Sequence, residues 1–341
     1  GNTTGSYNTA LGKDALGSNT TANNNIAIGF NSLTTNTSGG SNVSLGVEAL
    51  KENTTASNNT GIGFHALKLN TTGTSNVAVG ALALDANTTA DNNTAVGTNA
   101  GTSNTTGAET NAFGYNALLS NTTGNANCAF GNSSLDANTT GGLNVAMGIQ
   151  SLSGNTTASE NTAIGTFAMR DNTTGASNVA VGKSALLANT TASNNTAVGT
   201  AALFANTTGT LNTAVGSLAL DANTTANDNT AVGYSSLGKN TTGASNTAIG
   251  AESMDSNTTG SNNTAVGDRS LSANTTGTQN VAVGALALDA NTTAVNNTAV
   301  GHSSLSANTT ASNNTAVGAG ALVANTTGGQ NTAVGSLSLD A

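Results

Sequence analysis

Apolar residues recur along this chain with a fixed 17-residue period. An aliphatic or aromatic side chain, such as Leu11, Ile28 or Leu45, stands immediately before a glycine in each of twenty consecutive repeats. Two residues before it lies, in nearly every repeat, a threonine or an aliphatic residue, and between them lies an alanine, replaced only by Ser44 and Gly61. Alternation of this kind is typical of a β-strand and not of a helix. The sequence therefore predicts one short strand in every repeat.

Each repeat can be numbered from the asparagine of its Asn-Thr-Thr string, so that Asn2 occupies position 1 and Gly12 occupies position 11. The repeat then reads N-T-T-[GA]-x-x-N-[TV]-A-[VI]-G-x-x-[AS]-L-x-x and continues without insertion or deletion. A short repeat that cannot bury a core alone is typical of a solenoid. We expect an all-β parallel β-solenoid (a β-roll or β-helix) with one coil per 17-residue repeat and 20 coils, forming a single continuous array over 1–341. Because no capping sequence covers either end, we expect the array to be a segment of a longer chain.

The distribution of residue types predicts which positions face inward. All charged side chains and both histidines fall at positions 5, 6, 12, 13, 16 and 17, which are therefore expected at the surface. We expect positions 8 and 10 to share one side of the strand and to point into the interior. Extended stretches are expected at Asn-Thr-Thr, at Thr-Ala-Val and around Ala-Leu. Glycine at position 11 suits a bend with positive φ or a close backbone approach.

The interior predicted in this way is thin. Each coil buries about two large aliphatic side chains, worth about 1.5–3 kcal/mol each, whereas ordering a whole coil costs far more. Asparagine columns at positions 1 and 7 can add amide hydrogen bonds from coil to coil, although asparagine also suits turns. A marginal single stack favours self-association into a homo-oligomer, either a trimer or a fibre, or else a covering layer of some other kind. Position 4 tends to alternate between Gly and Ala, so that two successive repeats form a second, longer period.

Composition narrows the choice of partners. Charged residues make up 7% of the chain, the formal net charge is −9, and seven basic residues are scattered over the repeats. Nucleic-acid binding needs clustered Lys and Arg, so we expect no nucleic-acid partner. No apolar run is long enough to span a bilayer, so we expect no membrane insertion of this segment. The single cysteine, Cys128, stands where other repeats carry Thr or Val, and we interpret it as a semi-buried small residue.

The residue pattern contains no constellation that points to catalysis. His65 and His302 lie fourteen repeats apart, so they cannot share a metal ion or a proton relay. Glu48 and Glu52 are interpreted as isolated surface charges. Catalysis needs unlike residues that converge at one irregular place. We therefore expect no catalytic residues, no metal site, no enzyme activity and no cofactor apart from covalent glycans.

Every repeat carries the N-x-[ST] glycosylation acceptor. If this stretch is extended, its Asn and the second hydroxyl residue share a face, which we expect to be the outer one. A carbohydrate coat on Asn, Thr or both would then shield the thin core. Alternatively, Asn and Thr only form ladders and cap the coil, and a different hypothesis is an ice-binding solenoid that presents a Thr/Asn ladder face. The candidate glycosylation sites are Asn2, Asn19, Asn36, Asn53, Asn70, Asn87, Asn104, Asn121, Asn138, Asn155, Asn172, Asn189, Asn206, Asn223, Asn240, Asn257, Asn274, Asn291, Asn308 and Asn325.

Three strings carry a resemblance to a known family. Asn8-Thr-Ala-Leu-Gly12, Asn42-Val-Ser-Leu-Gly46 and Asn178-Val-Ala-Val-Gly182, each followed after two residues by Ala or Ser, resemble the head repeats of trimeric autotransporter adhesins. They are also similar to repeats of bacterial and phage fibres. The resemblance implies a left-handed parallel β-roll, usually trimeric, that is displayed outside the cell and used for attachment. We therefore expect an extracellular or cell-surface structural fibre segment with an adhesive role, whose partners are copies of itself and surface or carbohydrate ligands.

Overall fold

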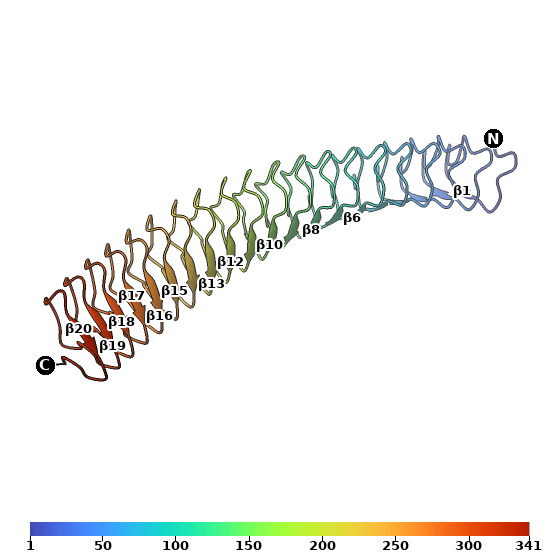
Figure 1. Cartoon of the computed structure of the whole chain (residues 1–341). Helices are drawn as coiled ribbons and strands as arrows, with labels where there is room; N and C mark the ends of the chain where they lie inside the picture. The colour runs from blue at the N-terminus through green and yellow to red at the C-terminus, as the bar shows by residue number, and fades with distance from the viewer. Residues whose placement is uncertain (341) are drawn as a thin grey trace. The chain divides into compact units, whose positions relative to one another are not determined.

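The protein is described by a computed structural model, which covers residues 1–340 and divides into two compact units, Gly1–Thr174 and Gly175–Ala341. Each unit contains ten short strands, and no helix occurs within residues 1–340. Figure 1 shows one strand in every coil, with the strands of each unit side by side. The 17-residue register is the same in both units. A single continuous array stays a prediction.

The strands all occupy positions 8–10 of the repeat and are three residues long. In the N-terminal unit they are β1 Thr9–Leu11, β2 Ile26–Ile28, β3 Val43–Leu45, β4 Thr60–Ile62, β5 Val77–Val79, β6 Thr94–Val96, β7 Asn111–Phe113, β8 Cys128–Phe130, β9 Val145–Met147 and β10 Thr162–Ile164. In the C-terminal unit they are β11 Val179–Val181, β12 Thr196–Val198, β13 Thr213–Val215, β14 Thr230–Val232, β15 Thr247–Ile249, β16 Thr264–Val266, β17 Val281–Val283, β18 Thr298–Val300, β19 Thr315–Val317 and β20 Thr332–Val334.

Within each unit every strand pairs in parallel with the strand of the next coil. The register is set by the repeat, so that Ala231 of β14 lies opposite Ala248 of β15 and each residue meets its own copy. Parallel strands of this kind stack about 4.8 Å apart. The prediction of an all-β parallel β-solenoid with one coil per repeat is confirmed. The left-handed coil that the family resemblance implies stays a prediction.

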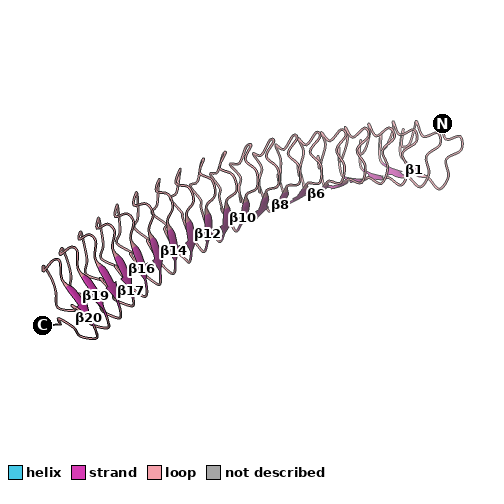
Figure 2. Cartoon of the chain, viewed as in Figure 1, coloured by secondary structure: helices cyan, strands magenta, loops and turns pink. Residues whose placement is uncertain are grey.

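Most of each coil consists of turns, which Figure 2 shows in pink between the short magenta strands. Three non-glycine residues in a typical coil have left-handed backbone geometry, at positions 6, 13 and 15; in one coil they are Asp228, Ser235 and Leu237, with φ of 60°, 53° and 53°. The predicted extended stretch around Ala-Leu is therefore wrong. A left-handed leucine is strained, but Leu237 is 0% exposed, and burial of its side chain offsets that strain.

The interior face of the strand is the alanine face. Ala214 of β13 is 0% exposed, whereas Val215 beside it is 37% exposed. Positions 8 and 10 therefore point outward, and the prediction that they point into the interior is wrong. Gly61 shows why the interior side of the strand admits only small residues, because a Cβ there would lie 3.1 Å from Cγ of Leu50 and 3.2 Å from the carbonyl oxygen of Ala66.

The glycine at position 11 has the geometry that the sequence predicts. Its φ lies between 127° and 143° in all twenty coils, a region that side-chain-bearing residues rarely adopt. A Cβ on Gly216 would also overlap the carbonyl oxygen of Gly233 in the next coil. Both the bend and the close approach are therefore present, and they explain why this position never varies.

A pair of substitutions tests the assignment of inner and outer faces. We expect Leu237→Ala, which empties a fully buried site, to cost about 2–5 kcal/mol of stability. We expect Val232→Ala on the outer side of β14 to cost about 1 kcal/mol or less. Amide hydrogen exchange of β13 to β15 measures both effects locally, and a larger cost for Val232→Ala would contradict the assignment.

Candidate functional site

The asparagines at position 1 form a hydrogen-bonded ladder inside the coils. Asn121 donates from Nδ2 to Oδ1 of Asn104 in the preceding coil at 2.8 Å and to the carbonyl oxygen of Gly124 at 3.0 Å. Its own Oδ1 accepts from Nδ2 of Asn138 in the following coil at 2.9 Å. Both amide protons are thus used, and the side chain is 1% exposed. The ladder links each coil to the coils on either side of it.

The asparagines at position 7 form a second buried ladder with a different bonding pattern. Oδ1 of Asn229 accepts from the backbone N–H of Asn246 at 3.0 Å, and Nδ2 of Asn246 donates to the carbonyl oxygen of Gly260 at 2.8 Å. Thr110 replaces asparagine in one coil, and its hydroxyl bonds to Oδ1 of Asn93 at 2.8 Å. Nδ2 of Asn93 is left buried without a partner. The coil with Thr110 therefore keeps the bond to Oδ1 of Asn93 but contains one unpaired buried amide donor.

Eighteen of the twenty candidate glycosylation sites are buried. From Asn19 to Asn308 the position 1 asparagines are 0–1% exposed, and only Asn2 and Asn325 are not buried. The prediction that these asparagines face outward is wrong. Their side-chain amides point into the coil, where they hydrogen-bond to one another and to backbone carbonyl oxygens in place of water. A glycan on Nδ2 would have to replace a bonded proton at a site without free surface. The ladder alternative describes their arrangement, and N-linked modification stays an untested prediction.

The two threonines of the Asn-Thr-Thr string have different surroundings. The position 2 hydroxyl bonds to the next coil: in Thr241, both N and Oγ1 donate to the carbonyl oxygen of Thr258, at 2.9 and 3.0 Å. The position 3 residue is exposed in every coil. Within residues 1–340 its hydroxyl makes no hydrogen bond to the protein. The ice-binding alternative requires an outward Thr/Asn face, whereas this arm has buried asparagines and one unbonded threonine column.

The second, two-repeat period corresponds to a cap on alternate coils. The backbone N–H of position 5 bonds to the position 5 side chain of the next coil, as Gly142 does with Oγ of Ser159 at 3.0 Å and Ala244 with Oγ of Ser261 at 3.0 Å. Asn227 caps Thr210 in the same manner at 2.7 Å. Coils that provide a cap therefore carry a short polar residue at position 5. Coils that only receive a cap can carry glycine or alanine there.

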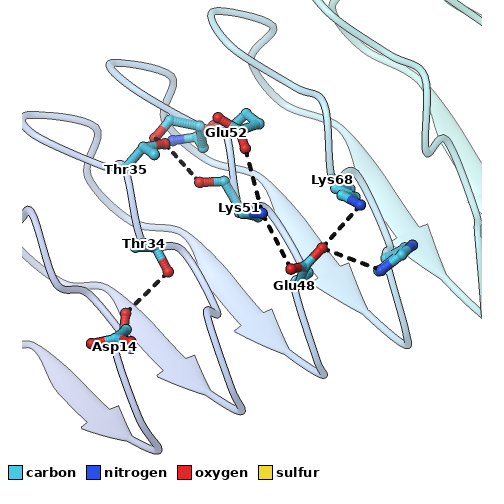
Figure 3. Close-up of polar contacts among 9 residues, drawn as sticks. Asp14, Thr34, Thr35, Glu48, Lys51, Glu52 and Lys68 are labelled. Carbon is cyan, nitrogen blue, oxygen red and sulfur yellow. Dashed lines mark hydrogen bonds and ion pairs between the residues drawn. The ribbon is translucent and has the colours of Figure 1, made fainter.

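One charged cluster spans successive coils of the N-terminal unit. Figure 3 shows Glu48 beside Lys51 and Lys68. Oε1 of Glu48 lies 3.2 Å from Nζ of Lys51, and Oε2 lies 2.9 Å from Nζ of Lys68 and 3.3 Å from Nε2 of His65. The interpretation of Glu48 as an isolated charge is therefore wrong. Hydrogen bonds from the two lysines lower the pKa of Glu48 to about 2, and all the partners are ordinary surface side chains of positions 13 and 16.

Four aspartates at position 16 are half-buried and not fully solvated. Burial raises the pKa of Asp85, Asp136, Asp221 and Asp289 above the usual range. Oδ1 of Asp85 and Oδ1 of Asp289 are buried without a hydrogen-bond partner. Because the folded pKa is raised, the folded state is favoured at low pH and loses stability as the pH rises through that pKa. These carboxyls therefore weaken the coil at neutral pH.

The remaining candidate chemistry is sparse. Cys128 lies on β8 at the outward position 8, and burial raises the pKa of its thiol. Within residues 1–340, no three His, Cys, Asp or Glu side chains gather closely enough to hold a metal ion. The same residues include no helix long and apolar enough to cross a membrane.

The outer sheet face, formed by the side chains of positions 8 and 10, is the feature that the sequence interpretation missed. In the N-terminal unit the rings of Phe113 and Phe130 stack on this face with centroids 4.5 Å apart. In the C-terminal unit Val215 and Ile249 are 37% and 41% exposed. The size of position 9 was the available signal, since it is Ala, Ser or Gly in every repeat, as a crowded interior requires.

Comparison with known proteins gave no family model and no curated protein that matches this chain. The resemblance to adhesin head repeats therefore stays a prediction.

Truncation of one ladder asparagine tests how much the amide column contributes. We expect Asn121→Ala to leave the acceptors of Asn104 and Gly124 and the donor of Asn138 without partners, and each unsatisfied buried group costs about 1–3 kcal/mol. Asn132→Ala, at an exposed position of the same coil, is the matched control. Chemical denaturation with local amide exchange measures the difference, and equal effects would contradict a stabilising ladder.

The Glu48 cluster predicts an acid-sensitive region. Because the folded pKa of Glu48 is about 2 against an ordinary value of 4.5, its contribution to stability is present above pH 4.5 and is lost as the pH falls toward 2. We expect Glu48→Gln to flatten this dependence for the amides of β3 and β4. Glu252→Gln, on an exposed turn, should leave the pH profile unchanged; a similar change in both variants would refute the assignment.

Proposed function

We propose that this chain is a structural fibre segment that associates with further copies of itself through its outer sheet face. The proposal includes no catalytic step, and the molecule acts through its repetitive surface. The single observation that carries it is the aliphatic or aromatic character of position 10, which is kept in all twenty coils although this position points away from the coil interior.

Internal comparison of the repeats makes this observation informative. The other outward positions 5, 6, 12, 13, 16 and 17 vary freely in size and charge, so the coil itself does not constrain its exterior. Position 10 differs from them, because it remains Val, Ile, Leu, Met or Phe. A solvated face has no physical reason to exclude polar residues in every repeat. A face that becomes buried against another chain does.

The charge distribution supports the same partner. Neither position 8 nor position 10 carries a charged residue in any coil, and burial of a single unpaired charge in an interface is costly. A sheet face that remains exposed to water usually presents polar or charged side chains at its outward positions. Because the face lacks such charges along both units, a second copy with the same uncharged face is the occupant whose chemistry matches it.

The coil interior gives a further reason for association. Its contents are mainly alanine, asparagine and one leucine per coil, such as Ala231, Asn229 and Leu237. The larger aliphatic side chains of the strands lie outside and keep part of their apolar surface exposed, as Val215 and Ile249 do. Association would bury them and would add the apolar contacts that the single stack lacks.

The finer parts of the proposal rest on the family resemblance. They are a trimeric assembly, display outside the cell and an adhesive role toward surface or carbohydrate ligands. A glycan coat rests instead on the Asn-Thr-Thr acceptor string of every repeat. The outer sheet face supports assembly but names no attachment target. The variable and hydrated turns would remain available at the surface of such an assembly.

Paired lysine substitutions test the association. We expect the wild-type chain to sediment as an oligomer of the 32.8 kDa polypeptide. We expect the double variant Val215→Lys and Ile249→Lys to weaken association by at least about a hundredfold, because two charges would be desolvated at several kcal/mol each. Sedimentation equilibrium over a range of concentrations gives the dissociation constants.

The matched control adds the same two charges to the same coils away from the outer sheet face. Leu211 and Ser245 occupy the exposed position 6, and the double variant Leu211→Lys and Ser245→Lys should associate like the wild type. Amide exchange of β13 and β15 confirms that both variants fold. A monomeric wild-type chain, or equal association of both double variants, would rule out the proposed surface.

A further inference from the structure

The twenty repeats fold into equivalent coils, so each position that keeps its residue type can be matched with the contact that requires it. Positions 1 and 7 are buried amides, positions 4, 9 and 14 are buried small residues, and position 11 requires glycine. Position 15 fills the interior, and position 2 bonds to the next coil. Position 10 belongs to the outer sheet face. The backbone N–H of position 3 can bond to the next coil, as that of Thr242 does to the carbonyl oxygen of Thr258 at 3.2 Å, but the side chain of position 3 has no role in any of these contacts.

Position 3 nevertheless keeps a hydroxyl in every coil. It is threonine in nineteen repeats and serine at Ser38, it is exposed throughout, and its hydroxyl makes no hydrogen bond within residues 1–340. Recent duplication does not explain this, because exposed positions of the same repeats have diverged widely. Position 8 provides a contrast, since threonine and valine replace each other there. The retained group at position 3 is the hydroxyl itself.

The neighbours of this column indicate what kind of group uses the hydroxyl. The exposed residues of position 6 vary from Tyr7 to Glu109, Leu143 and Asp228. A partner surface recognised by shape would constrain these neighbours. A group attached covalently to oxygen needs only the hydroxyl, access to solvent and a recognisable local sequence. Asn-Thr-Thr followed by Gly or Ala supplies that sequence in nineteen repeats, and Asn36-Thr37-Ser38 followed by Gly supplies it in the other.

The column geometry also favours a neutral group over a charged one. Successive position 3 hydroxyls belong to coils stacked about 4.8 Å apart. Phosphoryl groups on that column would each carry nearly two negative charges beside their own copies, on a chain whose net charge is already −9. A sugar is neutral and hydrophilic, so a column of sugars at this spacing has no charge repulsion between its members.

We infer that the position 3 hydroxyl column is a site of O-linked glycosylation. In this reaction Oγ of the threonine or serine forms a bond to the anomeric carbon of a nucleoside diphosphate sugar. The bond from that carbon to the phosphate oxygen breaks, and the nucleoside diphosphate leaves with the bonding electrons. The hydroxyl proton passes to a base of the transferase that carries out the step. The inference does not depend on self-association of the chain.

The test uses the full chain produced in its own source cells. We expect proteolytic peptides of this array to exceed the mass of the bare peptides by a whole number of sugar residues, and fragmentation that preserves glycosidic bonds should place them at position 3. Changing four consecutive position 3 residues to valine should remove the sugars of these four coils, whereas changing them to serine should retain them. The four residues are Thr208, Thr225, Thr242 and Thr259.

The matched control removes four hydroxyls from the same coils at position 8. Valine at these positions should leave the attached mass unchanged; the residues are Thr213, Thr230, Thr247 and Thr264. Amide exchange checks that both sets of variants fold alike. Masses equal to those of the bare peptides, sugars on asparagine or at other hydroxyls, or no loss from the position 3 valine variant would each overturn the inference. Noncovalent capture of the hydroxyls by water or another chain would give the first of these outcomes.

Discussion

The structure depends on one constraint, which is that the buried asparagine side chains pair with residues of the adjacent coils. Asn121 is bonded to Asn104 before it and to Asn138 after it, so a ladder step can be satisfied only when the copies lie in register. One inserted residue would place an amide opposite an alanine and leave buried donors and acceptors unpaired. The absence of any insertion in twenty repeats follows from this requirement.

The same constraint determines where the apolar side chains can lie. Two amide ladders and the inward alanines occupy most of the interior, which leaves space for one leucine in a typical coil. Strand residues with larger side chains must then lie on the other side of the backbone. The outer sheet face is therefore a consequence of a polar interior, and the distinction between core and surface in this fold follows side-chain size as much as hydrophobicity.

The period, the strand positions and the solenoid could be predicted from sequence because each depends on a pattern that repeats. The bend at Gly216 could also be predicted, since only glycine suits its geometry. The direction of the strand could not, because alternation shows that Ala214 and Val215 face opposite ways without showing which one faces inward. Hydrophobicity alone predicts that Val215 faces inward. In the structure the inward residue is Ala214, because position 9 lies against the leucine and alanine of the coil interior and only a small side chain fits there. The left-handed backbone at Leu237 also had no signal, since leucine has no preference for it.

The caps at position 5 have a consequence for how such a chain can change its length. Because a capped coil and its capping neighbour form a pair, gain or loss of a whole pair by unequal recombination keeps every cap, whereas a change of one coil places two members of the same kind together. The chain contains such a place. Thr278 and Val295 occupy position 5 of successive repeats, and the valine side chain has no acceptor that could cap the N–H of Thr278. The N–H of Val295 is itself capped by Oγ of Ser312 at 3.0 Å. The pairing is shifted there by one coil, as a single-coil insertion would leave it, and the cost is one surface N–H that water can satisfy. Variants of this array that differ in length should therefore differ mostly by even numbers of coils.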